Sequence, residues 1–191
     1  MNDPIGLLAQ WIDDAGGMET IEAIAMCLAT ARRDARPSAR IVLLRGLDRR
    51  GLRFYTSYLS RKGRELAENP DAAAVFYWPQ LQRQVRVEGD VTLLSDDESD
   101  AYFIARPRGH RLAAWASEQS EPLESYATLE ERFTHFDARF EGEEVPRPHS
   151  WGGYLLVPSR FEFWQGRPNR MHARTLYLRS ANAWNVTLLQ P

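Results

Sequence analysis

The chain has 191 residues, a formal net charge of -2, a hydrophobic fraction of 43% and a charged fraction of 26%. These values are typical of a globular protein, so we expect residues 1–191 to form a single domain. Without a basic excess or an apolar run near the roughly 20 residues of a membrane span, we expect neither a nucleic-acid partner nor a membrane. The N-terminus has no signal-like leader, and the lone cysteine, Cys27, allows no intrachain disulfide. We therefore expect a cytoplasmic protein with Cys27 as a small core residue.

The chain begins with a short helix. Asp3 can cap it, Pro4 suits its first turn, and Gly16-Gly17 should end it. Runs rich in Val, Leu, Phe and Tyr then predict strands at residues 25–29, 39–45, 52–57, 72–77 and 84–94. Between the third and fourth runs, residues 60–69 predict a short helix that stops at Asn69-Pro70.

Two capping boxes predict helices in the second half of the chain. Ser95 with Glu98 should open one that runs to about residue 106, and Thr128 with Glu131 should open another that reaches Phe140. Further strands are predicted at residues 154–157, 161–164, 175–178 and 184–188. Many short strands with a few interleaved helices indicate a mainly β fold, a β-barrel with peripheral helices.

A candidate anion site lies at Ser60-Arg61-Lys62-Gly63, where a strand gives way to a helix. Two cations, a hydroxyl and free backbone N–H groups at a helix N-terminus suit a phosphate, although the spacing is not that of a Walker loop. Lys62 is also the one lysine among 24 basic residues. A compositional bias towards arginine explains most of that, yet the position also suits a compact ammonium group.

Two predicted strands carry polar residues that a purely structural strand would not need. Arg40 and Arg45 bracket an apolar run, and alternation places Gln84, Arg86 and Glu88 on one face of a later strand. A solvated strand face explains this pattern about as well as a lined site for an anionic, planar ligand does.

Two further clusters combine charge with aromatic or imidazole groups. Tyr102 and Arg106 are four residues apart on a predicted helix, so they share a face, although a solvated rim would look the same. Arg170, His172 and Arg174 alternate, and on a strand all three side chains would share a face.

Metal and nucleophile motifs are absent. The four histidines show no ligand spacing, one cysteine cannot build a zinc site, and no G-x-S-x-G or G-x-G-x-x-G segment occurs. The sequence therefore predicts no metal and argues against a hydrolase or a Rossmann enzyme.

Several segments together resemble the pyridoxamine 5′-phosphate oxidase family, which has the FMN-binding split β-barrel fold. The resemblance runs from Asp3-Pro4 to Pro191 without a large gap. The segments that carry it are RPSARIVLLRG, FYTSYLSRKGRELAENPDAA, QRQVRVEG, YFIARPRG, AWASEQS, VPRPHSWGGY and FEFWQGRPNRMHAR.

The resemblance implies a homodimer with FMN at the subunit interface. By position, it implies flavin contacts for Arg40, Ile41, Val42, Leu43, Leu44, Tyr55, Thr56, Arg61, Lys62, Gln84, Gln119, Ser120, Trp164 and Arg174. It implies substrate contacts for Arg45, Tyr102, Arg106, His110, Arg170 and His172. Arg170 and His172 would lie over the substrate ring as the catalytic residues.

The implied reaction is oxidation at the 4′ carbon of pyridoxamine or pyridoxine 5′-phosphate, a small phosphorylated pyridine. A hydride passes to flavin N5, dioxygen reoxidises the flavin with release of hydrogen peroxide, and the protein orients the donor carbon. The product is pyridoxal 5′-phosphate, formed with release of ammonia when the substrate is the amine.

Three positions depart from the family pattern, all on the substrate side. Arg45 stands where a lysine is usual, His110 where a small hydroxyl residue is usual, and Ala173 where an acidic residue is usual. They leave open a sibling FMN oxidase that acts on another reduced ring, as in phenazine-type biosynthesis. A non-catalytic protein that binds flavin or pyridoxal phosphate is the second alternative.

Overall fold

The computed structural model describes residues 3–181 and 183–191, and across them the chain forms nine strands in one antiparallel sheet. The strands are β1 (Ala25–Ala31), β2 (Pro37–Leu43), β3 (Gly46–Asp48), β4 (Gly51–Ser57), β5 (Asp71–Trp78), β6 (Arg83–Leu93), β7 (Trp151–Gln165), β8 (Ala173–Ser180) and β9 (Ala183–Leu189). Hydrogen-bonded neighbours follow the order β2-β1-β5-β6-β7-β4-β3, and β8 joins β7 with β9 beyond it.

The helices lie around the sheet. They are α1 (Pro4–Asp14), α2 (Ile21–Ile24), α3 (Arg61–Glu68), α4 (Asp96–Ile104), α5 (Arg108–Ala116) and α6 (Tyr126–Arg139), with 3₁₀ turns η1 (Pro79–Leu81) and η2 (Pro168–Arg170). The expected mainly β fold with peripheral helices is confirmed. In the described part of the chain, no helix is both long enough and apolar enough to cross a bilayer.

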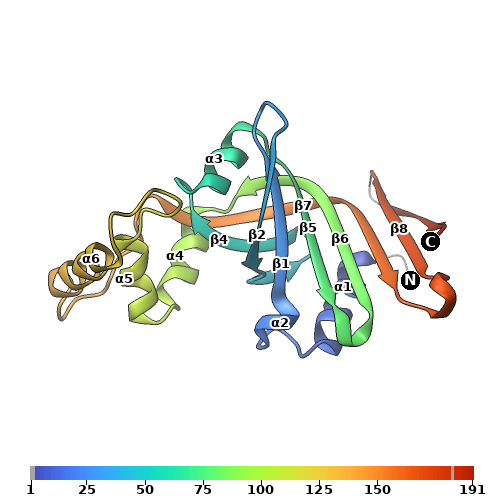
Figure 1. Ribbon diagram of the computed structural model, residues 1–191, viewed down its shortest axis with the longest axis horizontal. Helices are drawn as coiled ribbons and strands as arrows, with labels where there is room; N and C mark the ends of the chain where they lie inside the picture. Colours follow the sequence, from blue (N-terminus) through green and yellow to red (C-terminus); the bar gives the residue numbers. More distant parts are fainter. Residues whose placement is uncertain (1–2, 182) are drawn as a thin grey trace.

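The long strand β7 connects the two ends of the molecule. Its first half pairs with β4, so that Trp151 lies opposite Ser57, and its second half pairs with β8, so that Trp164 lies opposite Arg174. β6 runs beside both halves, and the register shifts between Glu88 and Gly89. As a result α4, α5 and α6 lie at one end of the long axis and β8 lies at the other (Figure 1).

Alternation along the strands decides which side chains enter the core. In β1, Met26, Leu28 and Thr30 are buried, whereas Cys27 points to the opposite face and is half-exposed. The expected core position of Cys27 is therefore wrong, because its parity in the strand places it outside. In β6 the expected alternation is confirmed, with Val85 and Val87 fully buried.

The ends of the first helix follow the sequence signals. The Asp3 carboxylate accepts the Ile5 N–H at 3.1 Å, and Gly16 and Gly17 take φ values of 122° and 76° just after α1. These left-handed values are readily accessible to glycine, which explains why the helix stops there. The α1 face with Leu8 and Ile12 packs into the main core.

Two sequence predictions about element boundaries are wrong. The last helix begins at Tyr126 instead of Thr128, because Ser125 acts as N-cap and accepts the Thr128 N–H at 3.1 Å. The two strands predicted within residues 151–165 are one, because Pro158 lies opposite Gly89 at the register shift, where a missing N–H costs little.

Helix α5 is missing from the sequence prediction. Pro107 and Gly109 at its start are breaker residues, and no side chain caps its first turn. Tertiary packing holds it instead, through a small second core formed by Leu112, Phe140 and Val145. Packing of this kind commonly overrides local propensity.

Candidate functional site

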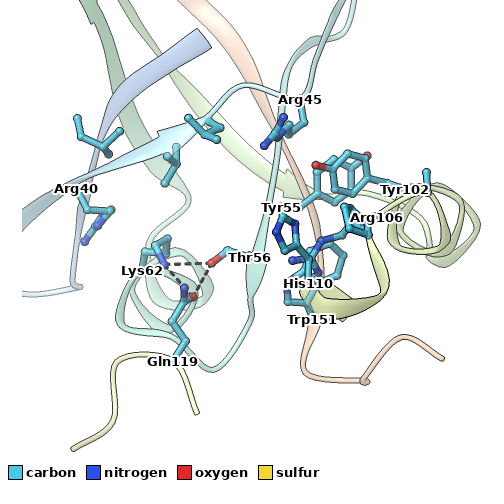
Figure 2. Close-up of a pocket in the computed structure, with 15 residues that line it drawn as sticks. Arg40, Arg45, Tyr55, Thr56, Lys62, Tyr102, Arg106, His110, Gln119 and Trp151 are labelled. Atoms are coloured by element: carbon cyan, nitrogen blue, oxygen red, sulfur yellow. Dashed lines mark hydrogen bonds between the residues drawn. The ribbon is translucent and has the colours of Figure 1, made fainter. Parts of the chain in front are cut away.

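A cavity of about 660 Å³ opens between β2, β4, α3, α4 and the start of α5 (Figure 2). This size lies within the range of about 300–1,000 Å³ that is usual for cofactor pockets. Many of the predicted site residues line it, and we call them the cavity group: Arg40, Ile41, Val42, Leu43, Arg45, Tyr55, Thr56, Lys62, Tyr102, Arg106, His110 and Gln119. Ala105, Pro107 and Trp151 complete the lining.

One corner of the cavity is built around the lysine. Ser60 caps α3 by accepting the Gly63 N–H at 3.3 Å, and this places Lys62 in the first turn. The buried Lys62 ammonium donates to Thr56 Oγ1 and to Gln119 Oε1, both at 3.1 Å (Figure 2). Burial, and next the nearby Arg40 charge, lower the pKa of Lys62 to about 8. Because its hydrogen-bond acceptors are neutral oxygens, this corner suits an anion.

The opposite wall of the cavity is an aromatic stack. The rings of Tyr55 and Tyr102 are parallel with centroids 3.8 Å apart, and Trp151 lies 5.7 Å from Tyr55 with nearly the same tilt. Gly153 makes this possible, because a Cβ there would lie 2.7 Å from the Tyr55 ring. The Arg106 guanidinium lies 4.6 Å from the Trp151 ring, in cation–π range.

Arg106 is poised for a second anion. Its NH1 atom is buried and has no hydrogen-bond partner among the described residues. Burial lowers the pKa of its guanidinium, and the nearby charge of Arg45 lowers it further. His110 lies beside it, as Figure 2 shows. Cations held together with an unused buried donor suit a phosphate or a carboxylate.

Trp151 is a site residue that the sequence reasoning missed. It lies in the segment SWGGY, where two glycines follow the indole and leave room for neighbouring rings. An indole followed by two glycines was the signal in the sequence that could have identified Trp151.

The prediction that Tyr102 and Arg106 share a helix needs a correction, since α4 ends at Ile104 and Arg106 follows it, yet both residues do line the cavity.

Three predicted flavin residues lie beside the cavity without lining it. Leu44 is fully buried next to Leu43 in sequence, Arg61 is exposed at the start of α3, and Ser120 follows Gln119 with a φ of 75°. The Arg61 Nε donates to the buried carboxylate of Glu65 at 2.9 Å.

The remaining predicted residues form a separate cluster, which we call the strand-end group: Gln84, Trp164, Arg170, His172 and Arg174. None of them lines the cavity. Gln84 and Trp164 are register partners on β6 and β7, and Trp164 faces Arg174 on β8. Between Trp151 and Trp164 the strand β7 runs for about 40 Å, at roughly 3.3 Å per residue. One chain therefore presents its predicted site as two parts.

The turn that carries the predicted catalytic residues is not a strand. Asn169 and Arg170 take left-handed φ values of 56° and 59° in η2, and His172 follows before β8 begins. The expected shared strand face of Arg170, His172 and Arg174 is therefore wrong. Two consecutive left-handed residues other than glycine store backbone strain, which clusters at functional sites.

The orientation of His172 follows from one hydrogen bond. The Arg167 backbone N–H donates to His172 Nδ1 at 3.2 Å, and the imidazole packs against Trp164 with ring centroids 4.7 Å apart. When Nδ1 accepts, the neutral ring carries its proton on Nε2. His172 is thus set to donate from Nε2.

The donor set fits FMN. The Lys62 corner offers a buried cation for the phosphate, while Gln84 and Trp164 offer an amide and an indole for a planar ring. Groups of three or more His, Cys, Asp or Glu side chains arranged for a metal are not found among residues 3–181 and 183–191.

Comparison with known families covers most of the chain. Residues 19–139 match the family model described as pyridoxamine 5′-phosphate oxidase, and residues 151–191 match the pyridoxine 5′-phosphate oxidase C-terminal dimerisation region. A pyridoxine/pyridoxamine 5′-phosphate oxidase from Rubrobacter xylanophilus is 54% identical over 189 residues, which cover 99% of this chain and 87% of that protein. The protein of the same name from Burkholderia mallei is 56% identical over 184 residues, covering 95% and 86%.

Solved structures agree on the fold. PhzG from Burkholderia lata 383, in complex with tetrahydrophenazine-1-carboxylic acid, superposes with a TM-score of 0.93 at 35% identity, covering 100% of this chain and 94% of that one. A pyridoxamine 5′-phosphate oxidase-related, FMN-binding protein from Nostoc punctiforme has a TM-score of 0.77 at 22% identity, covering 97% and 96%. The FMN-binding split-barrel fold expected from the sequence is confirmed.

Proposed function

This chain belongs to the pyridoxamine 5′-phosphate oxidase family of FMN-dependent oxidoreductases, and from that premise we propose that it oxidises pyridoxamine or pyridoxine 5′-phosphate to pyridoxal 5′-phosphate. Dioxygen would be the acceptor and hydrogen peroxide the second product. The relatives that are more than half identical carry the name of this activity.

The observation that carries the proposal is the anion pocket at Arg106. A buried NH1 atom without a partner in the described chain lies beside Arg45, His110 and the Tyr55–Tyr102 stack. The substrate phosphate would accept from Arg106 and Arg45, which would offset their mutual repulsion and satisfy the buried donor. The Tyr102 hydroxyl and His110 would complete the phosphate contacts.

We propose that two copies of the chain form each complete site. The cavity group and the strand-end group do not share a cavity within one chain, and residues 151–191 match a dimerisation region. The cavity group of one chain would hold the FMN phosphate, and Gln84, Trp164 and Arg174 of a second copy would contact the flavin. Each chain, residues 1–191, would then be one domain of a homodimer.

The protein residues would bind and orient, and bound FMN would supply the hydride acceptor. Arg170 and His172 would hold the substrate ring so that its 4′ carbon faces the flavin. Because His172 Nδ1 already accepts the Arg167 N–H, the neutral imidazole would donate a hydrogen bond from Nε2 instead of removing a proton. Lys62 would neutralise the cofactor phosphate from its buried corner.

A second function has its own support. The PhzG structure that superposes with a TM-score of 0.93 contains tetrahydrophenazine-1-carboxylic acid, a reduced ring with a carboxylate. A carboxylate could use the Arg45–Arg106 pair as a phosphate would, and Ala173 beside His172 offers no carboxylate to orient the imidazole. Oxidation of a reduced aromatic carboxylic acid is therefore the alternative.

Anaerobic mixing of the FMN-loaded protein with each substrate class tests the proposal. Pyridoxamine 5′-phosphate should bleach the flavin absorbance within seconds, and the colour should return in air. A reduced phenazine carboxylic acid should leave it unchanged. Bleaching by the carboxylic acid alone would establish the alternative, and a flavin that stays oxidised with both would refute both reactions.

A further inference from the structure

Two buried carboxylates stand behind the two parts of the site. Glu65 on α3 is 2% exposed and Glu162 on β7 is 3% exposed, and they are the only buried acidic residues in the described chain. Acidic side chains are rarely this buried unless they are paired. Each one is paired with two arginines. Both partners of Glu65 and one of the two partners of Glu162, Arg174, are among the residues expected to bind FMN.

Glu65 joins three elements through its two oxygens. Oε1 accepts from Arg61 Nε at 2.9 Å. Oε2 accepts from Thr30 Oγ1 at 2.5 Å, from Ser38 Oγ at 2.6 Å and from Arg40 NH2 at 3.2 Å. Burial alone would raise the pKa of Glu65, but these hydrogen bonds together lower it to about 2. The carboxylate is therefore ionised throughout the pH range in which enzymes work.

The same network of hydrogen bonds fixes the orientation of the Arg40 guanidinium. Its NH1 donates to the Leu28 carbonyl at 3.2 Å and to Thr30 Oγ1 at 2.5 Å, while NH2 donates to Ser38 Oγ and to Glu65. All four terminal N–H groups are thereby used, and the side chain still lines the cavity. Arg40 cannot turn without breaking several of these bonds.

Glu162 does the same at the strand end. Its Oε1 accepts from Arg174 Nε at 2.8 Å, and its Oε2 accepts from Arg86 NH1 at 3.3 Å. The Arg174 NH1 also donates to the Gln190 carbonyl at 2.9 Å. The guanidinium is held beside Trp164, its register partner on β7.

We propose that Glu65 and Glu162 are positioning residues for FMN: each is a buried carboxylate that holds flavin-binding arginines in a fixed orientation before the cofactor arrives. The proposal rests on the FMN contacts of the proposed function, and on no particular substrate. Buried ion pairs commonly add little to stability, because desolvation offsets the attraction, so stability alone explains these two poorly. An arginine already held in place loses little side-chain freedom when it binds the cofactor.

A role of Glu65 through its charge and a role through orientation of the arginines predict opposite changes in the FMN Kd, so a single substitution distinguishes them. Glu65 cancels part of the positive charge near the cofactor phosphate, so if only charge mattered, Glu65→Gln would tighten FMN binding. If orientation matters, the same change weakens binding, because an amide cannot accept from both arginines and the hydroxyls as a carboxylate does.

The experiment is a titration of the full-length protein, stripped of FMN, with FMN, followed by quenching of flavin fluorescence. Glu65→Gln and Glu162→Gln should each raise the FMN Kd about tenfold. Matched controls are Glu68→Gln, on α3 but outside the Arg40 and Arg61 network, and Asp90→Asn, an exposed acid on β6 outside the Arg86 and Arg174 network. Both controls should stay within about twofold of the unchanged protein. An unchanged or lower Kd for the Glu65 and Glu162 variants would overturn the proposal.

A double-mutant cycle separates positioning from general damage. In an Arg40→Ala background, Glu65→Gln should lose a large part of its effect on the FMN Kd, because one of its two arginine partners is gone. Full additivity would overturn the proposal for Glu65. If Glu65→Gln fails to fold, Thr30→Val removes the hydroxyl between the carboxylate and Arg40, and should raise the Kd about threefold. No change in that variant would likewise overturn it.

These readouts do not depend on turnover. A higher FMN Kd in the two variants, together with no bleaching by pyridoxamine 5′-phosphate in the unchanged protein, would uphold the positioning role and refute the proposed reaction. Normal bleaching of the unchanged protein, together with unchanged FMN Kd values in the two variants, would uphold the proposed reaction and refute the positioning role.

Discussion

The cavity group and the strand-end group hold their arginines in the same way but differ in how complete they are. The cavity group is a preformed pocket, with a buried Lys62 ammonium and three stacked rings behind it. The strand-end group lies on the surface, where Arg170 is exposed and the 3₁₀ turn holds two left-handed residues. The cavity group is enclosed by its own chain, whereas no residue of the strand-end group lines that cavity in the described part of the chain.

This difference indicates a division of labour. A buried, hydrogen-bonded ammonium suits permanent retention of a charged cofactor, since water cannot compete for it. An exposed turn that stores strain suits a substrate that must enter and leave. We therefore expect changes at the Lys62 corner of the cavity group to affect flavin retention first, and changes at Arg170 or His172 to affect turnover first.

The largest expected effect is at the lysine. Lys62→Met removes the buried cation but keeps most of the side-chain volume, so the FMN Kd should rise at least about 100-fold. The variant should be purified colourless, and the ratio of flavin to protein absorbance measures this directly. Adding Arg61→Ala should leave it colourless. A fully yellow Lys62→Met protein would refute the assignment of the Lys62 corner to the FMN phosphate, and with it the division between cofactor retention and turnover.

Changes at the two substrate residues of the strand-end group should give the opposite phenotype. His172→Ala and Arg170→Ala should retain FMN but lower kcat/KM about 100-fold, because both side chains orient the substrate and neither holds the cofactor. His172→Gln keeps an amide donor near the Nε2 position and should recover part of the loss. Flavin content and steady-state kinetics are the measurements. If either alanine variant lost its flavin, the two groups would not be divided as described.

The sequence predicted the cavity group better than the strand-end geometry. Ser60 and Lys62 are two positions apart in sequence and follow helix-capping rules, so local reasoning sufficed for them. Trp151 was missed because its partners, Tyr55 and Arg106, come from distant segments. The turn at Arg170 was misjudged as a strand, because left-handed backbone at Asn169 and Arg170 has no reliable signal in residues other than glycine.

The pH dependence of FMN binding should sharpen the comparison. The pKa of Lys62, about 8, lies below the ordinary value of 10.5 because burial disfavours the charged form. The cofactor phosphate binds the charged form, so binding is strong below about pH 8 and weakens as the pH rises and the ammonium deprotonates. Between about pH 7 and pH 9 the Kd should rise up to about tenfold. A titration series on the unchanged protein and on Lys62→Met, which should show no such rise, tests this.

The smallest expected effect concerns Trp151, a cavity residue that packs against Arg106 of the proposed substrate pocket. Trp151→Phe keeps an aromatic ring but weakens the cation–π contact with Arg106, which lies 4.6 Å from the indole. The guanidinium would then be held less firmly towards the anion pocket, so the KM for pyridoxamine 5′-phosphate should rise about threefold, with kcat and the FMN Kd unchanged. The matched control is Trp184→Phe, which alters a similar pair with Arg179 on the C-terminal hairpin, away from the cavity. A rise in the FMN Kd without a change in KM would place Trp151 on the cofactor side, so that even the far wall of the cavity would serve retention.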